Sequence, residues 1–192
     1  YEISDYDYIA GLKSFQDGMY QIQDISSMLA GEYTAPKAGD TIVDVCGAPG
    51  GKSINAALKM SEQGDCGRVI ARDLSDYKVA LIDENIKRLN ITNIQTQVYD
   101  ALDCDESLIN KADIVIADLP CSGLGIIGRK PDIKYNASPE KLQSLVDLQR
   151  DILKVVSRYV KSGGVLMYST CTINRAENED NADWICKESG FT

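Results

Sequence analysis

The sequence predicts an α/β fold of the doubly wound, Rossmann-like type, a mostly parallel sheet with helices on both faces. From residue 40 onward, short runs rich in β-branched residues alternate with longer segments whose apolar residues recur at helical spacing. The central runs are almost continuously apolar, as in strands that are buried on both faces. Strict alternation of strand and helix is typical of parallel sheets.

Five segments are predicted to be strands, namely 41–46, 68–74, 94–99, 112–119 and 165–170. Helices are predicted near 51–60 and over 76–90, 138–160 and 176–189. The third helix begins with Ser138 as N-cap and Pro139 at the first helical position, and "KSGG" is predicted to end it. Residues 15–30 are predicted to form a short extended piece followed by a helix. We therefore expect a lead-in segment, 1–39, and an α/β domain, 40–192.

Size and composition indicate one globular domain, since the chain has 192 residues and is 44% hydrophobic. No apolar stretch approaches the roughly 18 residues that a membrane span needs. The first residues contain no secretory signal, so we expect a cytoplasmic protein without a membrane partner, and a monomer. A start at Tyr1 and an end within the pattern at "ESGFT" suggest a piece of a longer protein.

The chain has six cysteines and no histidine. None of the cysteines forms a C-x-x-C pair, so we expect no zinc site and no other metal. The absence of histidine excludes Ser–His and Cys–His hydrolase chemistry within this chain. The net charge of −9 disfavours a surface that grips phosphates by itself. A nucleic-acid substrate would therefore need a local basic strip or contacts from outside this sequence.

A glycine-rich turn, "DVCGAPGGKS" at 44–53, follows the first strand. It fails the Walker pattern because Cys46 stands where glycine is required, and Pro49 breaks the dinucleotide fingerprint. What remains is a strand, a tight turn that lets a ligand approach the backbone, and a helix N-terminus directed at that ligand. The alternative is an ordinary strand-to-helix turn.

Two aspartates end the next two strands. Asp73 lies where an acidic side chain accepts hydrogen bonds from a ribose diol, although it could equally be the N-cap of the following helix. Asp100 ends the third strand, where it could meet an adenine amino group. Because ligands of such sheets bind outside the carboxyl ends of the strands, the turn and both aspartates indicate an adenosine-containing ligand.

Two cysteines also follow strands, Cys121 in "DLPCSG" and Cys171 in "STCT". If the fourth and fifth strands are neighbours, both thiols lie at the ligand end of the sheet and belong to one active site. Buried structural positions are expected instead for three others, Cys66, Cys104 and Cys186. A free thiol is only about 3% ionised at pH 7, so a nucleophilic thiol needs help. Without histidine, that help comes from nearby amides, from a positively charged cofactor, or from protonation of the electrophile.

A pyrimidine is a ring that accepts a thiol while it is protonated. A thiolate adds to C6, a proton is placed on N3, and C5 becomes electron-rich enough to take a methyl group from a sulfonium donor. Asp118, three residues before Cys121, is placed to hold the N3 edge. The second thiol could assist removal of the C5 proton and release of the enzyme. The residues alone leave open which thiol attacks.

Four motifs, "CGAPGGKS", "ARDLS", "DLPCSGLGIIGRKPDIKYN" and "YSTCTINRAENED", closely resemble those of the RsmB/NOL1/NOP2/Sun family of RNA cytosine-5 methyltransferases. The resemblance covers most of the chain and is nearest to the bacterial 16S rRNA enzymes of the family. It implies the methyltransferase version of the fold and a 16S rRNA substrate. It also implies that Cys171 is the nucleophile and that Cys121 helps to release the product.

The same resemblance implies that S-adenosylmethionine is the cofactor. It is implied to bind at Cys46, Gly47, Ala48, Pro49, Gly50, Gly51, Lys52, Asp73, Asp100 and Asp118. Residues 128–134, "GRKPDIK", are expected to border the RNA, with a solvated loop as the alternative.

Other functions stay open on the sequence alone. The target could be tRNA instead of 16S rRNA. A nucleotide-binding oxidoreductase or NTPase would use the same architecture, although the failed fingerprints disfavour it. A non-catalytic RNA-binding or assembly module would keep the fold but would not need both thiols and Asp118.

Overall fold

Parallel strands in the order β3-β2-β1-β4-β5 form the sheet of this computed structural model, which describes residues 7–64 and 67–192. The strands are β1 (Thr41–Asp44), β2 (Arg68–Asp73), β3 (Ile94–Val98), β4 (Ala112–Asp118) and β5 (Val160–Ser169). Strand order reverses between β1 and β4, so the carboxyl ends of these two strands flank the switch point at which ligands bind in such sheets. Each of the five predicted strands overlaps an observed one, and the predicted fold class is confirmed.

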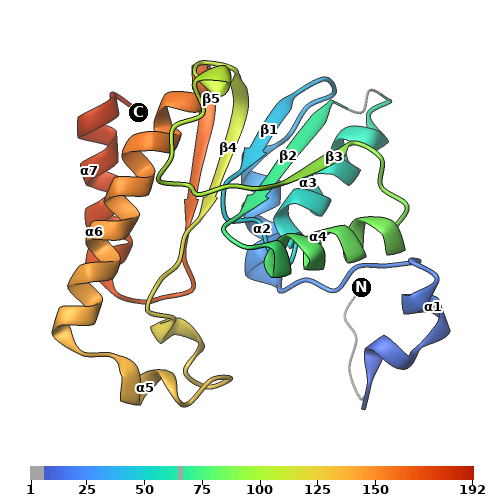
Figure 1. The fold of residues 1–192 in the computed structure, drawn as a ribbon, viewed down its shortest axis with the longest axis horizontal. Coiled ribbons are helices and arrows are strands. Elements are labelled where there is room, and N and C mark those ends of the chain that lie inside the picture. Colours follow the sequence, from blue (N-terminus) through green and yellow to red (C-terminus); the bar gives the residue numbers. More distant parts are fainter. Residues whose placement is uncertain (1–6, 65–66) are drawn as a thin grey trace.

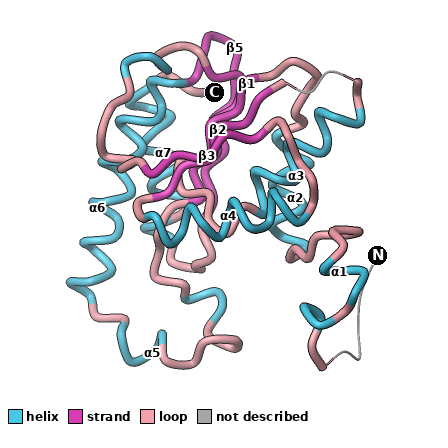
Figure 2. Tube along the Cα trace, turned by 45° about the vertical axis from the view of Figure 1, so that its right-hand side comes forward, coloured by secondary structure: helices cyan, strands magenta, loops and turns pink. Residues whose placement is uncertain are grey.

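Two layers of helices cover the sheet (Figures 1 and 2). Helices α2 (Ile25–Thr34), α3 (Gly51–Glu62) and α4 (Asp76–Arg88) lie on one face, and α6 (Pro139–Val156) and α7 (Glu179–Ser189) lie on the other. Two short helices, α1 (Lys13–Gln16) and α5 (Ile133–Asn136), stand outside these layers. Among the described residues, no helix combines the length and apolar character that crossing a bilayer requires.

The core follows from the alternation of side chains along the strands. Ile42 packs with Met60 of α3 on one face of the sheet, whereas its neighbour Val43 packs with Leu153 of α6 on the other. All four side chains are fully buried. Successive residues of a strand point to opposite faces, so apolar residues at every position are needed to bury both faces.

The end of the long α6 helix differs from the prediction. The helix stops at Val156, a 3-10 turn (η4, Ser157–Tyr159) follows, and Val160 already belongs to β5. Tyr159 is buried, and its hydroxyl accepts a hydrogen bond from Asp105 N and donates one to Asp103 O. Because this ring is buried, the helix ends before "KSGG" and not at it. Gly163 and Gly164 lie within β5, where its pairing with β4 is irregular.

The cysteines expected to be structural have different environments. Cys104 is half-buried against the core, but Cys186 is exposed, so the expectation of burial is wrong for Cys186. Its neighbour Ile185 occupies the core-facing position of α7, and the next residue along a helix points about 100° away. Cys66 lies outside the described residues.

Candidate active site

The glycine-rich turn joins β1 to α3 and is fastened to β2. Gly47 N donates to Arg72 O at 2.8 Å, and Ala48 N donates to the Asp73 carboxylate at 3.1 Å. Gly50 has a φ of +103°, and a Cβ there would lie 3.2 Å from side-chain carbons of both Ile54 and Ile82. The close packing and the positive φ both require glycine, so the turn holds its backbone open toward the end of the sheet.

A cavity of about 250 Å³ lies against this turn. Residues 21–24 of the lead-in segment form one wall. The predicted cofactor residues that line it are Cys46, Gly47, Ala48, Pro49, Gly51, Lys52 and Asp118. Gly50 is not among the lining residues, because its backbone instead packs under Ile54 and Ile82. The turn and Asp118 thus border one ligand-sized space.

Two buried polar atoms in the wall of this cavity have no hydrogen-bond partner among the described residues: Asp44 Oδ1 and Gln23 Nε2. Asp44 is 1% exposed, and its other oxygen accepts a 2.6 Å hydrogen bond from Ser53 Oγ. Buried polar groups are rarely left unpaired, so these two atoms indicate a polar ligand that pairs with them. Sequence reasoning missed both residues.

The protonation of Asp44 is unusual. The pKa of this carboxyl is raised to about 7, chiefly by burial and also by nearby Asp118, although the hydrogen bond from Ser53 and the charge of Lys52 act in the opposite direction. A ligand with a positive charge near Asp44 would favour the carboxylate form. The cavity therefore suits a cationic group better than an anionic one.

Asp73 and Asp100 lie at the carboxyl ends of their strands, but neither lines the cavity. Asp73 is buried, and its carboxylate accepts hydrogen bonds from Ala48 N and Leu74 N and pairs with Lys78. The N-cap of α4 is Ser75, so the alternative role of Asp73 as N-cap is wrong. Asp100 accepts a hydrogen bond from Leu102 N. In this conformation the Asp73 carboxylate holds the glycine-rich turn through Ala48 N, on the side away from the cavity.

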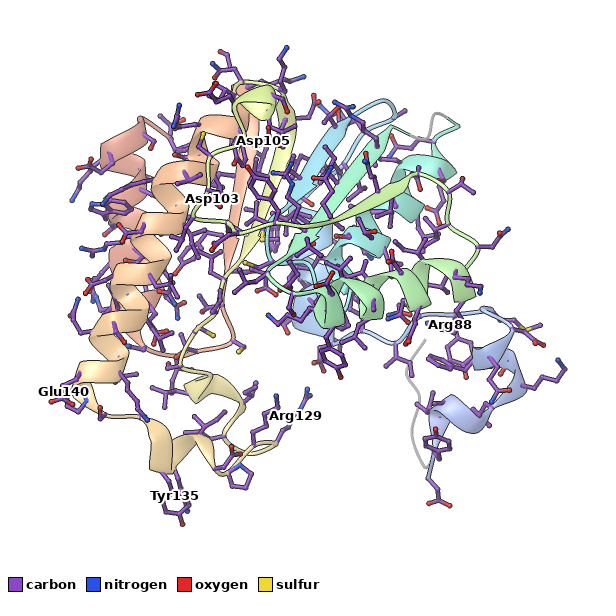
Figure 3. The ribbon with its side chains drawn as sticks, viewed as in Figure 1. Arg88, Asp103, Asp105, Arg129, Tyr135 and Glu140 are labelled. Carbon is purple, nitrogen blue, oxygen red and sulfur yellow. The ribbon has the colours of Figure 1, made fainter. Side chains whose placement is uncertain are left out.

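The lead-in wall of the cavity is attached to α4 by Arg88. Its guanidinium donates to Phe15 O and Tyr20 O, each at 3.0 Å, and stacks on the Phe15 ring. Figure 3 shows Arg88 between α4 and this segment. Asn85 of the same helix donates to Pro49 O at 3.1 Å, so α4 holds both walls of the cavity. No local sequence pattern reports such contacts between distant residues.

The two thiols meet as predicted. Strands β4 and β5 are neighbours, and the loops after them place Cys121 Sγ and Cys171 Sγ 3.2 Å apart. Cys171 N also donates to Cys121 Sγ at 3.2 Å. Gly125 N donates to Cys171 O, and a Cβ on Gly125 would lie 2.8 Å from that oxygen, so glycine is needed there.

The thiols differ in their surroundings. Cys171 is exposed and borders a cavity of about 730 Å³, whereas Cys121 is half-buried and borders a separate cavity of about 210 Å³. Burial and the hydrogen bond with Cys171 raise the pKa of Cys121 well above that of a free thiol. Burial also raises the pKa of Cys46, to about 12, so neither of these two is a ready nucleophile.

Asp118 lies between the two ligand spaces and borders both the 730 Å³ and the 250 Å³ cavities. Lys52 Nζ donates to one of its oxygens at 2.5 Å, and Ser169 Oγ donates to the other at 2.7 Å. These contacts fix the plane of the carboxylate at the end of β4. A group held here can contact a ring in the larger cavity and remain close to a ligand in the smaller one.

The larger cavity is bordered by the loop predicted to contact RNA. Gly128 and Arg129 line it, and Arg129 forms an ion pair with Asp24 at 2.8 Å. Arg129 projects from the loop that precedes α5 (Figure 3), and both side chains of this ion pair are largely exposed. Gly128 and Arg129 are both exposed, so a border with RNA stays a prediction for this loop and a solvated loop stays the alternative. In the described part of the chain, no group of acidic, cysteine or histidine side chains could hold a metal ion.

The fold and this site together define a methyltransferase of the Rossmann-like class. Residues 32–189 match the family described as 16S rRNA methyltransferase RsmB/F. The probable ribosomal RNA small subunit methyltransferase B of Bacillus subtilis is 43% identical over 173 residues, covering 90% of this chain and 38% of that protein. The ribosomal RNA small subunit methyltransferase F of Escherichia coli O157:H7 is 35% identical over 170 residues, covering 88% of this chain and 35% of that protein.

Solved structures with a similar fold and at least 30% sequence identity agree with this family match. The crystal structure of PH0851 has a TM-score of 0.89 and 32% identity, over 96% of this chain and 41% of that one. The structure of NSun6 from Pyrococcus horikoshii with SFG has a TM-score of 0.84 and 30% identity, over 95% of this chain and 46% of that one. The chain therefore belongs to the RsmB/F family of 16S rRNA methyltransferases, whose methyl donor is S-adenosylmethionine. It spans about four tenths of the length of the curated relatives it matches.

The residues present fit this cofactor. The unpaired Asp44 oxygen and the position of the 250 Å³ cavity at the switch point of the sheet suit a ligand with a cationic amino-acid end. Gln23 Nε2, a donor, suits the carboxylate of the same end.

Proposed function

We propose that the chain methylates C5 of a cytosine in 16S rRNA through a covalent bond between Cys171 and C6 of the base. The observation that carries the proposal is the meeting of two thiols 3.2 Å apart at the ends of β4 and β5, beside an aspartate that borders both cavities. We place this activity in the cytoplasm. A tRNA cytosine is the second candidate substrate.

The proposed steps use three side chains. Cys171, the exposed thiol on the larger cavity, gives its proton to solvent and forms the S–C6 bond as a thiolate, while the electron pair of the C5–C6 double bond moves toward N3, which takes up a proton from solvent. Asp118, fixed by Lys52 and Ser169, accepts a hydrogen bond from the protonated N3 and so favours placing the proton there. S-adenosylmethionine supplies an activated methyl group. Cys121, as its thiolate, then takes the C5 proton. The electrons of the C5–H bond form the C5–C6 double bond again, the S–C6 bond breaks, the Cys171 sulfur leaves as a thiolate, and N3 gives its proton back to solvent.

The cofactor is proposed to bind along the glycine turn. Cys46–Lys52 approach it with their backbone, and Asp44 and Gln23 hold its amino-acid end. Asp73 and Asp100 are proposed to meet the ribose and the adenine, which would require Asp73 to exchange one of its present backbone contacts. Bisulfite mapping of 16S rRNA and tRNA from cells lacking the gene tests the function. If every cytosine of both RNAs is still methylated as in the parent cells, the proposal is contradicted and a non-catalytic assembly role is favoured.

The affinity for S-adenosylmethionine is expected to rise about tenfold from pH 6 to pH 8. With a pKa of about 7, Asp44 is mostly protonated at pH 6 in the free protein. Because a cationic ligand binds the carboxylate form, the affinity rises with the fraction of Asp44 that is ionised. Asp44→Asn is expected to bind more weakly at pH 8 and to lose this pH dependence. Calorimetry in buffers of different ionisation enthalpy measures both the affinity and the proton released. An unchanged pH profile in Asp44→Asn would contradict the assignment.

Arg129→Ala is expected to weaken RNA binding for all sequences and to reduce the slope of log K against log salt by about 1. Arg129 lines the larger cavity and, among the described residues, pairs only with an exposed aspartate, so it can contact a phosphate. The control is Arg68→Ala, which removes an exposed arginine at the opposite end of the sheet. Filter-binding titrations at several salt concentrations measure the slope. Equal slopes for the parent and Arg129→Ala would show that Arg129 contacts no phosphate.

A further inference from the structure

A buried carboxylate lies behind the loop that carries Cys121. Glu177, on the 3-10 turn η5 (Arg175–Glu177), is fully buried. One of its oxygens accepts hydrogen bonds from Ser122 N at 2.9 Å and from Gln149 Nε2 at 3.0 Å. The other oxygen accepts from Asn174 Nδ2 at 2.9 Å. This residue lines none of the three cavities described above, so it touches neither base nor cofactor.

The same cluster holds both chain neighbours of Cys121. Glu177 holds Ser122 through its backbone N–H, and Gln149 Nε2 donates to Pro120 O at 2.8 Å. The backbone on either side of Cys121 is thus attached to one pair of buried side chains. Because a single rotatable bond joins the sulfur to the backbone, fixing Pro120 and Ser122 limits the sulfur to three staggered positions, and the hydrogen bond from Cys171 N favours one of them.

The orientation of Gln149 is itself determined. Its Oε1 accepts a 2.9 Å hydrogen bond from Asn181 Nδ2, which leaves its Nε2 to face Pro120 O and Glu177. Tyr168 of β5 donates to Glu177 O and so connects the turn to the strand that leads to Cys171. The cluster therefore joins the loops of both thiols and has one arrangement of donors and acceptors.

The charge of Glu177 matters to this arrangement. Within the described residues, no lysine or arginine forms an ion pair with it. Burial raises the pKa of Glu177, but the hydrogen bonds from Ser122, Asn174 and Gln149 outweigh burial and lower it below the ordinary value. An ionised carboxylate accepts only, and here it faces three N–H donors. A glutamine at this position would direct its own N–H at one of these donors, and that hydrogen bond would be lost.

We propose that Glu177 is a positioning residue that, through Ser122 and Gln149, holds Cys121 against Cys171. The catalytic consequence rests on the proposed function, since it concerns the step in which Cys121 releases the methylated base. The geometric consequence does not, because it concerns only the separation of two thiols. The two consequences can be measured separately.

The geometric test is cross-linking of the thiols by diamide without RNA. Diamide takes two hydrogens and becomes the hydrazine, while the two thiols become a disulfide and the protein loses two mass units. We expect Glu177→Gln to slow formation of the Cys121–Cys171 disulfide by about tenfold, the scale on which losing an outer hydrogen-bond partner acts. Two controls are matched to it. Glu179→Gln makes the same change at an exposed position of α7, and Ile185→Ala lowers stability from a core position remote from the loop. Both are expected to cross-link at the parental rate.

The catalytic test uses RNA and S-adenosylmethionine with the same variants. We expect Glu177→Gln to accumulate the covalent protein–RNA adduct about tenfold over the parent, in the manner of Cys121→Ala. If Glu177→Gln fails to fold, Gln149→Met replaces it, since it releases Pro120 and is expected to act in the same direction.

Parental cross-linking and normal release in the folded variant would overturn the proposal. Loss of adduct formation, as in Cys171→Ala, would also overturn it by assigning Glu177 to the nucleophile. If Glu177→Gln cross-links slowly but Cys121→Ala forms no adduct with RNA, the positioning role is upheld and the proposed chemistry is rejected.

Discussion

Cys171→Ala is expected to abolish methyl transfer, whereas Cys121→Ala is expected to leave the RNA covalently attached to the protein. Without the Cys171 thiol no S–C6 bond forms, and C5 of the base stays unreactive. The loss should be roughly four orders of magnitude or more, the scale of removing a covalent nucleophile. Without Cys121, attack and methylation proceed, but the C5 proton is not taken and the S–C6 bond persists.

Single-turnover methylation with labelled S-adenosylmethionine measures the first effect, and a protease-sensitive RNA shift on a denaturing gel measures the second. Cys186→Ala is the matched control, because this thiol is exposed on α7 and borders none of the three cavities described above. The opposite pattern, with adduct in Cys171→Ala and none in Cys121→Ala, would exchange the two roles. Full activity in Cys171→Ala would reject covalent catalysis.

The sequence predicts the meeting of the thiols because parallel strands place their carboxyl ends at one edge. Cys121 and Cys171 each follow a strand by two or three residues, and β4 and β5 are neighbours. The same reasoning finds the glycine turn and Asp118. It depends on where the strands end, which periodicity indicates, and on their direction, which the alternation of strands and helices predicts.

The supporting residues are not predictable in this way. Asp44 is the last residue of β1 and reads as an ordinary strand end, and Glu177 lies within a run of polar residues that suggests a solvated helix start. Both are buried because other elements pack against them. Ser53 of α3 donates to Asp44, and Gln149 of α6 and Ser122 donate to Glu177. The polar pattern predicts exposure, and tertiary contacts override it.

Arg88 illustrates the same limit for the lead-in segment. The helical spacing in α4 identifies it as a surface position near the helix end, but its partners are backbone carbonyls roughly 70 residues earlier in the sequence. Those contacts bring residues 21–24 against the glycine turn and complete the small cavity. One wall of the cofactor site thus depends on a contact that no motif records.

Asp118→Asn is expected to lower the methyl-transfer rate by about 10² to 10⁴, the usual range for a group that handles a proton or its charge in the transition state. The carboxylate accepts from Lys52 on one oxygen and from Ser169 on the other, and an amide can accept on only one. The side chain would rotate or lose Lys52, and the N3 edge of the base would lose its fixed partner. Binding of S-adenosylmethionine should weaken much less, because Asp118 is one of many residues lining the small cavity.

Asp113→Asn is the matched control, since it makes the same change at the other end of β4, where Asp113 pairs with Lys161 and accepts from Thr41 N. The loss of an ion pair on β4 is common to both variants, so a difference in rate between them isolates what Asp118 does at the carboxyl end. Single-turnover rates at saturating RNA and cofactor measure that difference, and calorimetry measures cofactor affinity. Asp118→Asn would contradict the role at N3 if its rate stayed within about threefold of Asp113→Asn, because a fixed hydrogen bond to developing charge is worth more than that.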